Sequence, residues 1–372
     1  MQLADRKIAV IGMGKTGIAA AAFLGGSGAA VVAVDEKPRD QWGGEFEQIA
    51  HRPWLAVGRY DETCLDGVDL VVPSPGIPPR HPLLTAAQQK KIPILSEVEL
   101  ACRFIRVPII AVTGTNGKTT TTTLLGEILA RAGKKVFVGG NIGNPLIEYA
   151  GAAQTDDFIV AEISSFQLQW IESFRPHAAI LLNITCDHVN YHGSFEEYRR
   201  IKGRIFENQR ENDLAVLNAE DPQQEGLDAS MRACVVRFSS VRPLAPGLCL
   251  QKDSLVYSGP DGTDERYPLG MIRIPGLHNV ENVMAAVAVA RFCGCSKESI
   301  VEAVSQFRGL PHRIEFAGEK RAVQFYDDSK GTNVDAVVRA LQTFSSPVIL
   351  LLGGRDKDGN FDVLQPMLGA KT

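Results

Sequence analysis

Short apolar runs alternate with segments of helical periodicity along almost the whole of this chain. Runs such as 31–34 (VVAV) and 109–112 (IIAV) contain no charged residue, which is typical of strands buried on both faces. The helical segments between them are long enough to form the crossover connections that parallel strands require. The alternation therefore predicts an α/β protein, with helices on both faces of parallel sheets.

The 372 residues exceed what one hydrophobic core usually serves, so we expect more than one domain. Val107 and Pro108 open a new strand, and Gly309 to Pro311 interrupt the pattern again. These breaks predict domains at 1–106, 107–310 and 311–372. In the last domain only two strands, Ala322 to Tyr326 and Val348 to Leu352, flank one full helix, so we expect that the natural chain continues further.

Composition excludes several classes of partner. Charged residues make up 22% of the chain and its net charge is -4, with basic residues scattered along it. This pattern argues against binding to nucleic acid or to an anionic membrane. The N-terminal segment lacks the features of a signal peptide, and no apolar run is long enough to cross a bilayer. We expect a cytoplasmic monomer without membrane insertion, whose seven cysteines are buried, reduced thiols.

The segment TGTNGKTT lies between the strand 109–112 and a predicted helix from Thr121. Its backbone N–H groups and the helix N-terminus would point at one spot, where anions bind. The lysine can neutralise phosphate charge and the threonine after it can ligate Mg²⁺. Val112 replaces the first glycine of a full phosphate-loop motif, yet a plain glycine turn would not explain the lysine. We expect a triphosphate site made of Gly114, Thr115, Asn116, Gly117, Lys118, Thr119 and Thr120.

A second glycine-rich loop, GMGKTG at 12–17, also joins a strand to a helix. Asp35 closes the next strand at the distance expected of an acid that binds a ribose. The pattern suits NAD, but it would serve any diphosphate attached to a ribose, including a UDP-sugar. A plain helix-packing turn is the structural alternative.

Polar residues follow other strands and helices. Glu162 ends the strand FIVAE and His188 follows AILLNIT, so both could ligate a metal, although hydrogen-bonded structural groups are commoner there. Lys202 shares a helix face with Tyr198 and Phe206, which suggests that it is not fully exposed, although a lysine on a helix is more often solvated. Ser194 and Glu197 form a capping-box pattern at the start of that helix. Further groups lie at element ends and could be simple caps: Asn279, Asn282, Arg313 and the cluster 327–333.

The ordered series GMGKTG, VVPSPGIP, TGTNGKTT, AEISSFQLQ, NITCDHVNYHG, YRRIKGRIF, GLHNVENVMAA, GLPHRIE, DDSKGTN and LLLGGRDK resembles the Mur ligases. GMGKTG, VVPSPGIP and SSFQL are most similar to the branch that adds D-glutamate to UDP-N-acetylmuramoyl-L-alanine. The resemblance implies three domains: an N-terminal Rossmann-like domain, a central ATPase domain of phosphate-loop type, and a C-terminal Rossmann-like domain that is partial here. It also implies an acyl-phosphate intermediate, in peptidoglycan precursor synthesis.

The resemblance implies a role for individual residues. The UDP substrate would contact Lys15, Thr16, Asp35, Glu36, Lys37, Ser74, Gly76, Asn141 and His188. ATP would contact the TGTNGKTT loop with Asn282, Arg313 and Asp328, and the amino acid would contact Thr332 and Lys357. Two Mg²⁺ ions would be held by Thr119, Glu162, His188 and a carboxylated Lys202. Lys118, His188 and Lys202 would be the catalytic residues.

Three alternatives stay open at this point. A ligase of the same architecture could add L-alanine, a diamino acid, D-alanyl-D-alanine or a folate glutamate. GMGKTG could belong to an NAD-dependent oxidoreductase. The chain could also be a nucleotide-binding module without enzymatic activity.

Overall fold

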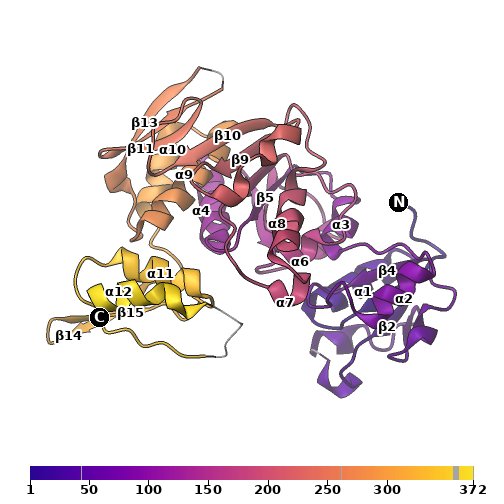
Figure 1. The fold of residues 1–372 in the computed structure, drawn as a ribbon. Coiled ribbons are helices and arrows are strands. Elements are labelled where there is room, and N and C mark those ends of the chain that lie inside the picture. Colours follow the sequence, from indigo (N-terminus) through magenta and orange to yellow (C-terminus); the bar gives the residue numbers. More distant parts are fainter. Residues whose placement is uncertain (43, 261, 355–359, 372) are drawn as a thin grey trace. The chain divides into compact units, whose positions relative to one another are not determined.

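The computed structural model describes residues 1–42, 44–260, 262–354 and 360–371, and it is an α/β protein as predicted (Figure 1). The chain divides into two compact units. The first unit contains Met1–Ala111, Phe137–Pro176 and Asn190–Asn208, and the second contains Val112–Val136, His177–Val189 and Gln209–Thr372. This division follows contacts and not sequence order, so the boundaries near 106 and 310 stay a prediction.

The first unit begins with a parallel sheet of order β3-β2-β1-β4. Helix α1 packs on β1, β2 and β4. Helix α2 contributes Leu83, Leu84 and Ala87 to a core that also contains Ile11 and Val34. The predicted start of the chain is therefore confirmed. The elements are β1 (Lys7–Ile11), α1 (Lys15–Gly26), β2 (Ala30–Val34), β3 (Leu55–Val57), β4 (Leu70–Pro73) and α2 (Pro82–Gln89).

The rest of the first unit is held partly by two buried carboxylates on helix α3. Glu99 accepts hydrogen bonds from the backbone N–H groups of Glu172, Ser173 and Phe174 at 2.8–2.9 Å. Glu97 accepts one from Ile147 N at 2.7 Å. These bonds satisfy backbone donors that apolar packing would leave unpaired. The elements are α3 (Glu97–Cys102), β5 (Ile109–Thr113), β6 (Val136–Gly140), α5 (Leu146–Ala150), β7 (Phe158–Glu162), α6 (Ser165–Leu168), α7 (Val189–His192) and α8 (Phe195–Gly203).

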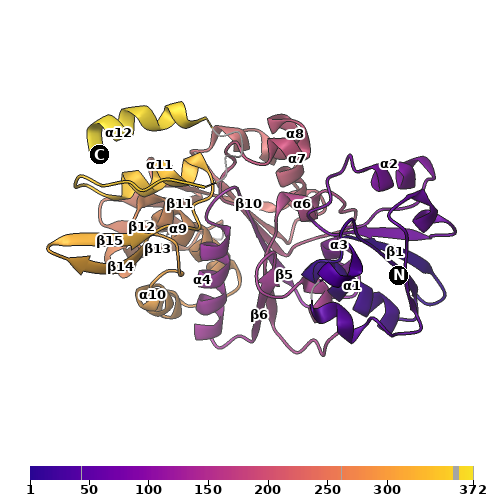
Figure 2. The same cartoon turned by 90° about the horizontal axis from the view of Figure 1, so that it is seen from below.

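The second unit contains the sheet order β13-β12-β11-β10-β9-β8. Strands β8, β9 and β10 are parallel, whereas β11, β12 and β13 form an antiparallel meander. Helices α4, α9 and α10 pack on one another (Figure 2). The elements are α4 (Lys118–Arg131), β8 (Ala178–Leu181), β9 (Leu214–Asn218), β10 (Cys234–Ser239), β11 (Gly247–Gln251), β12 (Ser254–Ser258), β13 (Asp264–Pro268), α9 (Leu277–Phe292) and α10 (Lys297–Gln306).

The last part of the second unit departs from the prediction. Strands β14 (Glu315–Lys320) and β15 (Val323–Asp327) form an antiparallel hairpin, followed by α11 (Val334–Thr343) and α12 (Gln365–Lys371). The predicted strand Val348 to Leu352 is wrong, because these residues adopt no regular structure and Ile349 and Leu351 are 88% and 92% exposed. A strand requires a hydrogen-bonded neighbour, and within the described residues β14 and β15 pair only with each other.

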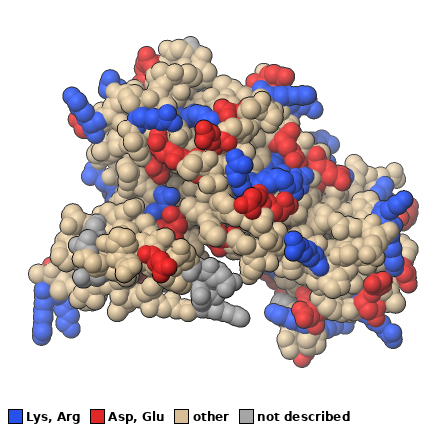
Figure 3. Space-filling view, in the orientation of Figure 1, with Lys and Arg blue, Asp and Glu red and all other residues tan. Residues whose placement is uncertain are grey.

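Acidic and basic side chains are interspersed on the face shown in Figure 3. Across the described residues, no helix combines the length and apolarity that a membrane span needs. All seven cysteines are free thiols. Three are buried, but Cys186 is exposed, so the expectation of buried thiols is wrong there.

Candidate active site

The TGTNGKTT loop joins β5 to α4, and two glycines shape it. Gly114 and Gly117 have φ angles of 152° and 86°, which other residues rarely adopt. A Cβ atom at Gly117 would lie 2.3 Å from the side-chain oxygen of Asn282. Helix α4 begins at Lys118, three residues before the predicted start at Thr121. Lys118 and Thr119 therefore belong to the first helical turn, where the N–H groups and the positive end of the helix dipole attract anions.

Asn183, just beyond strand β8, holds the loop in place. Its side-chain oxygen accepts from Asn116 N at 2.8 Å, and its Nδ2 donates to Asn116 O at 3.1 Å. Its backbone oxygen accepts from Thr115 N at 2.8 Å. The backbone of the loop is thus fixed by a neighbouring segment. Sequence reasoning missed Asn183, although an amide just after a parallel strand, beside a predicted phosphate loop, was a usable signal.

Two cationic side chains lie at the loop. Lys118 Nζ donates to Gly114 O at 2.9 Å and Thr115 O at 2.8 Å. Arg313 Nη2 donates to Thr119 Oγ1 at 3.1 Å. Positive charge therefore lies at the loop and the helix N-terminus, as an anionic phosphate chain requires.

One hollow of the second unit brings together six of the ten residues predicted to contact the nucleotide. Asn282, Arg313 and Asp328 all line it, with Asn116, Gly117 and Thr120 of the loop. His278, Asn279 and Arg339 also line it and were not predicted as nucleotide contacts. Burial, with the nearby charge of Arg339, lowers the pKa of His278 to about 4, so its imidazole is neutral at neutral pH. A neutral imidazole beside amides offers donors and acceptors suited to a heterocyclic base.

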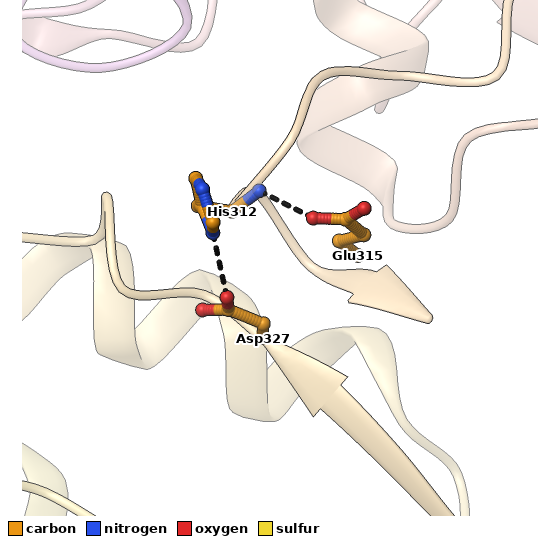
Figure 4. A group of neighbouring side chains, drawn as sticks. All are labelled: His312, Glu315 and Asp327. Carbon is orange, nitrogen blue, oxygen red and sulfur yellow. Dashed lines mark hydrogen bonds and ion pairs between the residues drawn. The ribbon is translucent and has the colours of Figure 1, made fainter. Parts of the chain in front are cut away.

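The segment before β14 is tied to the end of β15 (Figure 4). His312 Nδ1 lies 2.7 Å from Asp327 Oδ2, and His312 N donates to Glu315 Oε2 at 2.7 Å. Ile314 N donates to Asp328 Oδ1 at 3.1 Å. These contacts fix both neighbours of Arg313 and explain why Arg313 and Asp328 reach the same hollow.

The structure gives little support for the residues predicted to contact the amino-acid substrate. Thr332 is exposed, just before helix α11. Lys357 lies outside the described residues. Asn333, the next residue after Thr332, caps α11 by accepting from Ala336 N at 2.9 Å, so the capping interpretation of this cluster is confirmed for Asn333.

In the first unit, Glu162 is a buried carboxylate held by the loop after β6. Asn141 Nδ2 donates to Glu162 Oε1 at 2.7 Å, and Asn141 N donates to Glu162 O at 2.8 Å. Gly140 has a φ of 99°, and a Cβ atom there would lie 2.4 Å from Glu162 O. The side chain of Asn141, predicted as a substrate contact, thus orients the predicted metal ligand.

Lys202 is buried, with only 2% of its surface exposed, so the interpretation as a solvated lysine is wrong. Its Nζ lies 4.8 Å from the centre of the Tyr198 ring, one helical turn earlier. The Ser194 hydroxyl accepts from Glu197 N at 3.1 Å, as the predicted N-cap requires. The Glu197 carboxylate pairs instead with Arg200, at 2.7 Å. The basic group of Lys202 on α8 is therefore almost completely shielded from solvent.

In the first unit, the carboxylate of Asp35 accepts hydrogen bonds from the backbone around the GMGKTG loop. Asp35 Oδ2 accepts from Met13 N at 2.5 Å and its Oδ1 accepts from Lys37 N at 2.8 Å. Ser74 Oγ donates to Gly12 O at 2.6 Å. Lys15 Nζ donates to Gly143 O at 2.8 Å and Asn144 Oδ1 at 3.2 Å. Thr16 lies in the first turn of α1, after β1, and Glu36 and Gly76 follow the ends of β2 and β4, so these three residues lie at the carboxyl ends of the strands of this sheet. Asn141 and His188, also predicted for the UDP substrate, lie outside this sheet.

The predicted metal ligands belong to different units. Thr119 and His188 are in the second unit, where His188 Nδ1 lies 3.6 Å from Asp187 Oδ1. Glu162 and Lys202 are in the first. The two shared metal sites therefore stay a prediction.

Comparison with known proteins identifies the family. The Mur ligase middle domain matches residues 112–290, and the Mur ligase MurD-like N-terminal domain matches residues 6–96. The UDP-N-acetylmuramoylalanine--D-glutamate ligase of Syntrophus aciditrophicus is 54% identical over 370 residues, which are 99% of this chain and 82% of that protein. This chain belongs to the Mur ligase family. The resemblance drawn from the motifs is confirmed.

Two further proteins support this membership in the Mur ligases. The UDP-N-acetylmuramoylalanine--D-glutamate ligase of Geobacter metallireducens is 44% identical over 369 residues, 99% of this chain and 81% of that protein. The structure of a pseudomurein peptide ligase type C from Methanothermus fervidus matches with a TM-score of 0.54 at 21% identity, over 92% of this chain and 78% of that one. The latter likeness supports the Mur ligase fold alone. Membership of this family implies use of ATP.

Proposed function

We propose that this Mur ligase adds D-glutamate to UDP-N-acetylmuramoyl-L-alanine with ATP, as a cytoplasmic monomer in peptidoglycan precursor synthesis. The observation that carries the proposal is the 54% identity to a ligase of that name across 82% of its length. The chemistry of the two glycine-rich loops supports it, because one suits a triphosphate and the other a diphosphate joined to a ribose.

The reaction begins when the alanyl carboxylate attacks the γ-phosphate of ATP, which gives an acyl phosphate and ADP. The amine of D-glutamate then attacks the acyl carbon and releases phosphate. Lys118 and the first turn of α4 would bind the phosphate chain, and Arg313 adds a second positive charge at Thr119. Catalysis rests on positioning and on these charges, since phosphoryl transfer requires little covalent help from the protein.

The residues present fit Mg²⁺, which prefers oxygen ligands. Glu162 is buried and oriented by Asn141, and Thr119 offers a hydroxyl at the phosphate loop. When bound, Mg²⁺ would neutralise charge on the phosphates. We assign Thr119 and Glu162 to one ion and His188 with Lys202 to a second. An ammonium group is no metal ligand, so Lys202 would act as its carbamate, whose oxygens are suitable donors.

The first unit would hold the UDP substrate at the edge of its sheet. Asp35 lies where a ribose hydroxyl is bound in related loops, and Ser74 fixes the loop after β4 against Gly12. Lys15, Thr16, Glu36, Lys37 and Gly76 would complete this site, and Asn141 would extend it. In this assignment the GMGKTG loop does not bind NAD.

The assignment is tested by ADP release from MgATP in the presence of UDP-N-acetylmuramoyl-L-alanine and one amino acid at a time. We expect turnover with D-glutamate, and none above background with L-alanine, diaminopimelate or D-alanyl-D-alanine. Turnover with one of these instead would overturn the D-glutamate assignment. Binding of MgATP without turnover under any condition would favour a nonenzymatic nucleotide-binding module.

The carbamate is tested with Lys202→Ala. We expect at least about 100-fold loss of ADP release, because an oxygen donor for a metal is lost, and partial recovery with added formate or acetate. Arg200→Ala, on the exposed side of the same helix, should retain activity and respond to neither acid. Wild-type turnover by the Lys202 variant would remove this residue from the site.

A further inference from the structure

The first turn of helix α11 holds the side chain of Asn116, in the nucleotide loop. Asn116 Nδ2 donates to Asp335 Oδ2 at 2.8 Å, and Asn333 Nδ2 donates to Asn116 Oδ1 at 3.1 Å. The donor and the acceptor of this amide are thus both engaged by α11. More than 200 residues separate the partners, so the contact joins distant parts of the second unit.

The contact continues away from the loop. Asp335 Oδ2 also accepts from Arg339 Nε at 2.8 Å, one helical turn later. Arg339 Nη1 lies 3.6 Å from Glu281 Oε2 on α9, and Glu281 Oε1 accepts from Ser240 Oγ at 2.8 Å. Asp335, Arg339 and Glu281 are 16–25% exposed, so this chain of contacts is better shielded than a surface ion pair.

A carboxylate beside a triphosphate loop is unfavourable on its own, since like charges repel. Arg339 removes that difficulty, because the guanidinium neutralises Asp335 and leaves its Oδ2 as an oriented acceptor for Asn116. Asn333 adds a second connection, since its Nδ2 also lies 3.3 Å from Asp187 Oδ2, next to His188. Together these contacts join α11 to the loop and to the segment after β8.

We propose that Asp335 and Arg339 are positioning residues for the nucleotide loop. They orient the Asn116 side chain and hold α11 and the loop together as one body, which lowers the ordering cost of binding MgATP. The inference rests on the proposed function only in that the loop binds MgATP. Neither residue touches the reacting atoms in this assignment.

The test is the affinity for MgATP, measured by calorimetry on the full chain. Asp335→Ala and Arg339→Ala should each weaken binding about 5- to 10-fold, as the net loss of one hydrogen bond predicts. The double variant should be no weaker than either single variant, because both act through one connection. Asp335→Asn, which keeps an oxygen for Asn116, should bind more tightly than Asp335→Ala. Glu302→Ala is the matched control, since it removes an exposed carboxylate that pairs with Arg131 of α4 and accepts from Gln306 on its own helix.

Hydrogen exchange separates positioning from a general loss of stability. In Asp335→Ala, the amides of 115–117 should exchange faster while those of β9 do not change, and affinity for the UDP substrate should be unaltered. MgATP binding of wild-type strength in Asp335→Ala, or equal weakening in Glu302→Ala, would overturn the inference and leave the proposed function intact. A wild-type chain that does not bind MgATP overturns the proposed function itself.

Discussion

The two glycine-rich loops of this chain have the same local plan and opposite chemistry. Each connects a parallel strand to a helix, and each uses glycines where other residues would collide. In the first loop, the carboxylate of Asp35 accepts from Met13 N at 2.5 Å. In the second, the amine of Lys118 lies on the loop carbonyls, and neutral Asn183 fixes the backbone.

This difference supports the ligand that we propose for each loop. A carboxylate that occupies a loop N–H repels a triphosphate but accepts hydrogen bonds from ribose hydroxyls. A lysine at a helix N-terminus attracts a triphosphate. Glycine spacing alone therefore does not distinguish the two proposed ligands. The charge of the side chain at each loop, negative for Asp35 and positive for Lys118, does distinguish them.

Replacement of the lysine in each loop by alanine should give the largest difference in kinetics between the two loops. We expect Lys118→Ala to lower ligase kcat about 10²- to 10³-fold, because a cation facing the transferred phosphoryl group is lost. Lys15→Ala should change kcat little and raise KM for the UDP substrate a few-fold, since Lys15 is exposed and bonded to Gly143 and Asn144. Steady-state kinetics of both variants checks this. Equal losses of kcat would contradict the division of labour between the loops.

Glu97 should make the stability of the first unit depend on pH. Burial raises the pKa of this carboxyl from 4.5 to about 7, against the opposing effect of the Ile147 N–H. The stability that the protonated Glu97 side chain contributes to the fold is fully present below about pH 4.5 and is lost as the pH rises through about 7. Glu97→Gln cannot ionise, so it should exceed the wild type by about 2 kcal/mol at pH 8 and match it near pH 5. Denaturation at both pH values checks this, and a gap independent of pH would contradict it.

Removal of the acid that closes the first loop should have the smallest effect of the three. Asp35→Ala leaves Met13 N and Lys37 N without their acceptor, so affinity for the UDP substrate should fall about 10-fold. Affinity for MgATP should not change. Calorimetry with each ligand measures both, and Asp35→Asn should recover part of the loss. An equal fall in MgATP affinity would contradict the assignment of different ligands to the two loops.

Local patterns predicted the fold class, both loops and most strands, because hydrophobic periodicity and glycine spacing are properties of short segments. They misplaced a strand at Val348 to Leu352, since apolar composition does not supply a hydrogen-bonding neighbour. The burial of Lys202 and the role of Asn183 depend on residues far away in sequence, which spacing cannot reveal. The resemblance to a family predicted a role for Lys202, whereas the usual exposure of lysine side chains favoured a solvated residue.

The Asn183 contacts have a consequence for inhibitors and for resistance to them. The N–H groups that would hold a triphosphate belong to the main chain. Only substitution by proline would remove such a group. Their positions depend on Gly114, Gly117 and Asn183, where changes would also impair the natural nucleotide. An inhibitor that binds this backbone should leave fewer escape mutations than one that depends on exposed side chains such as Lys15.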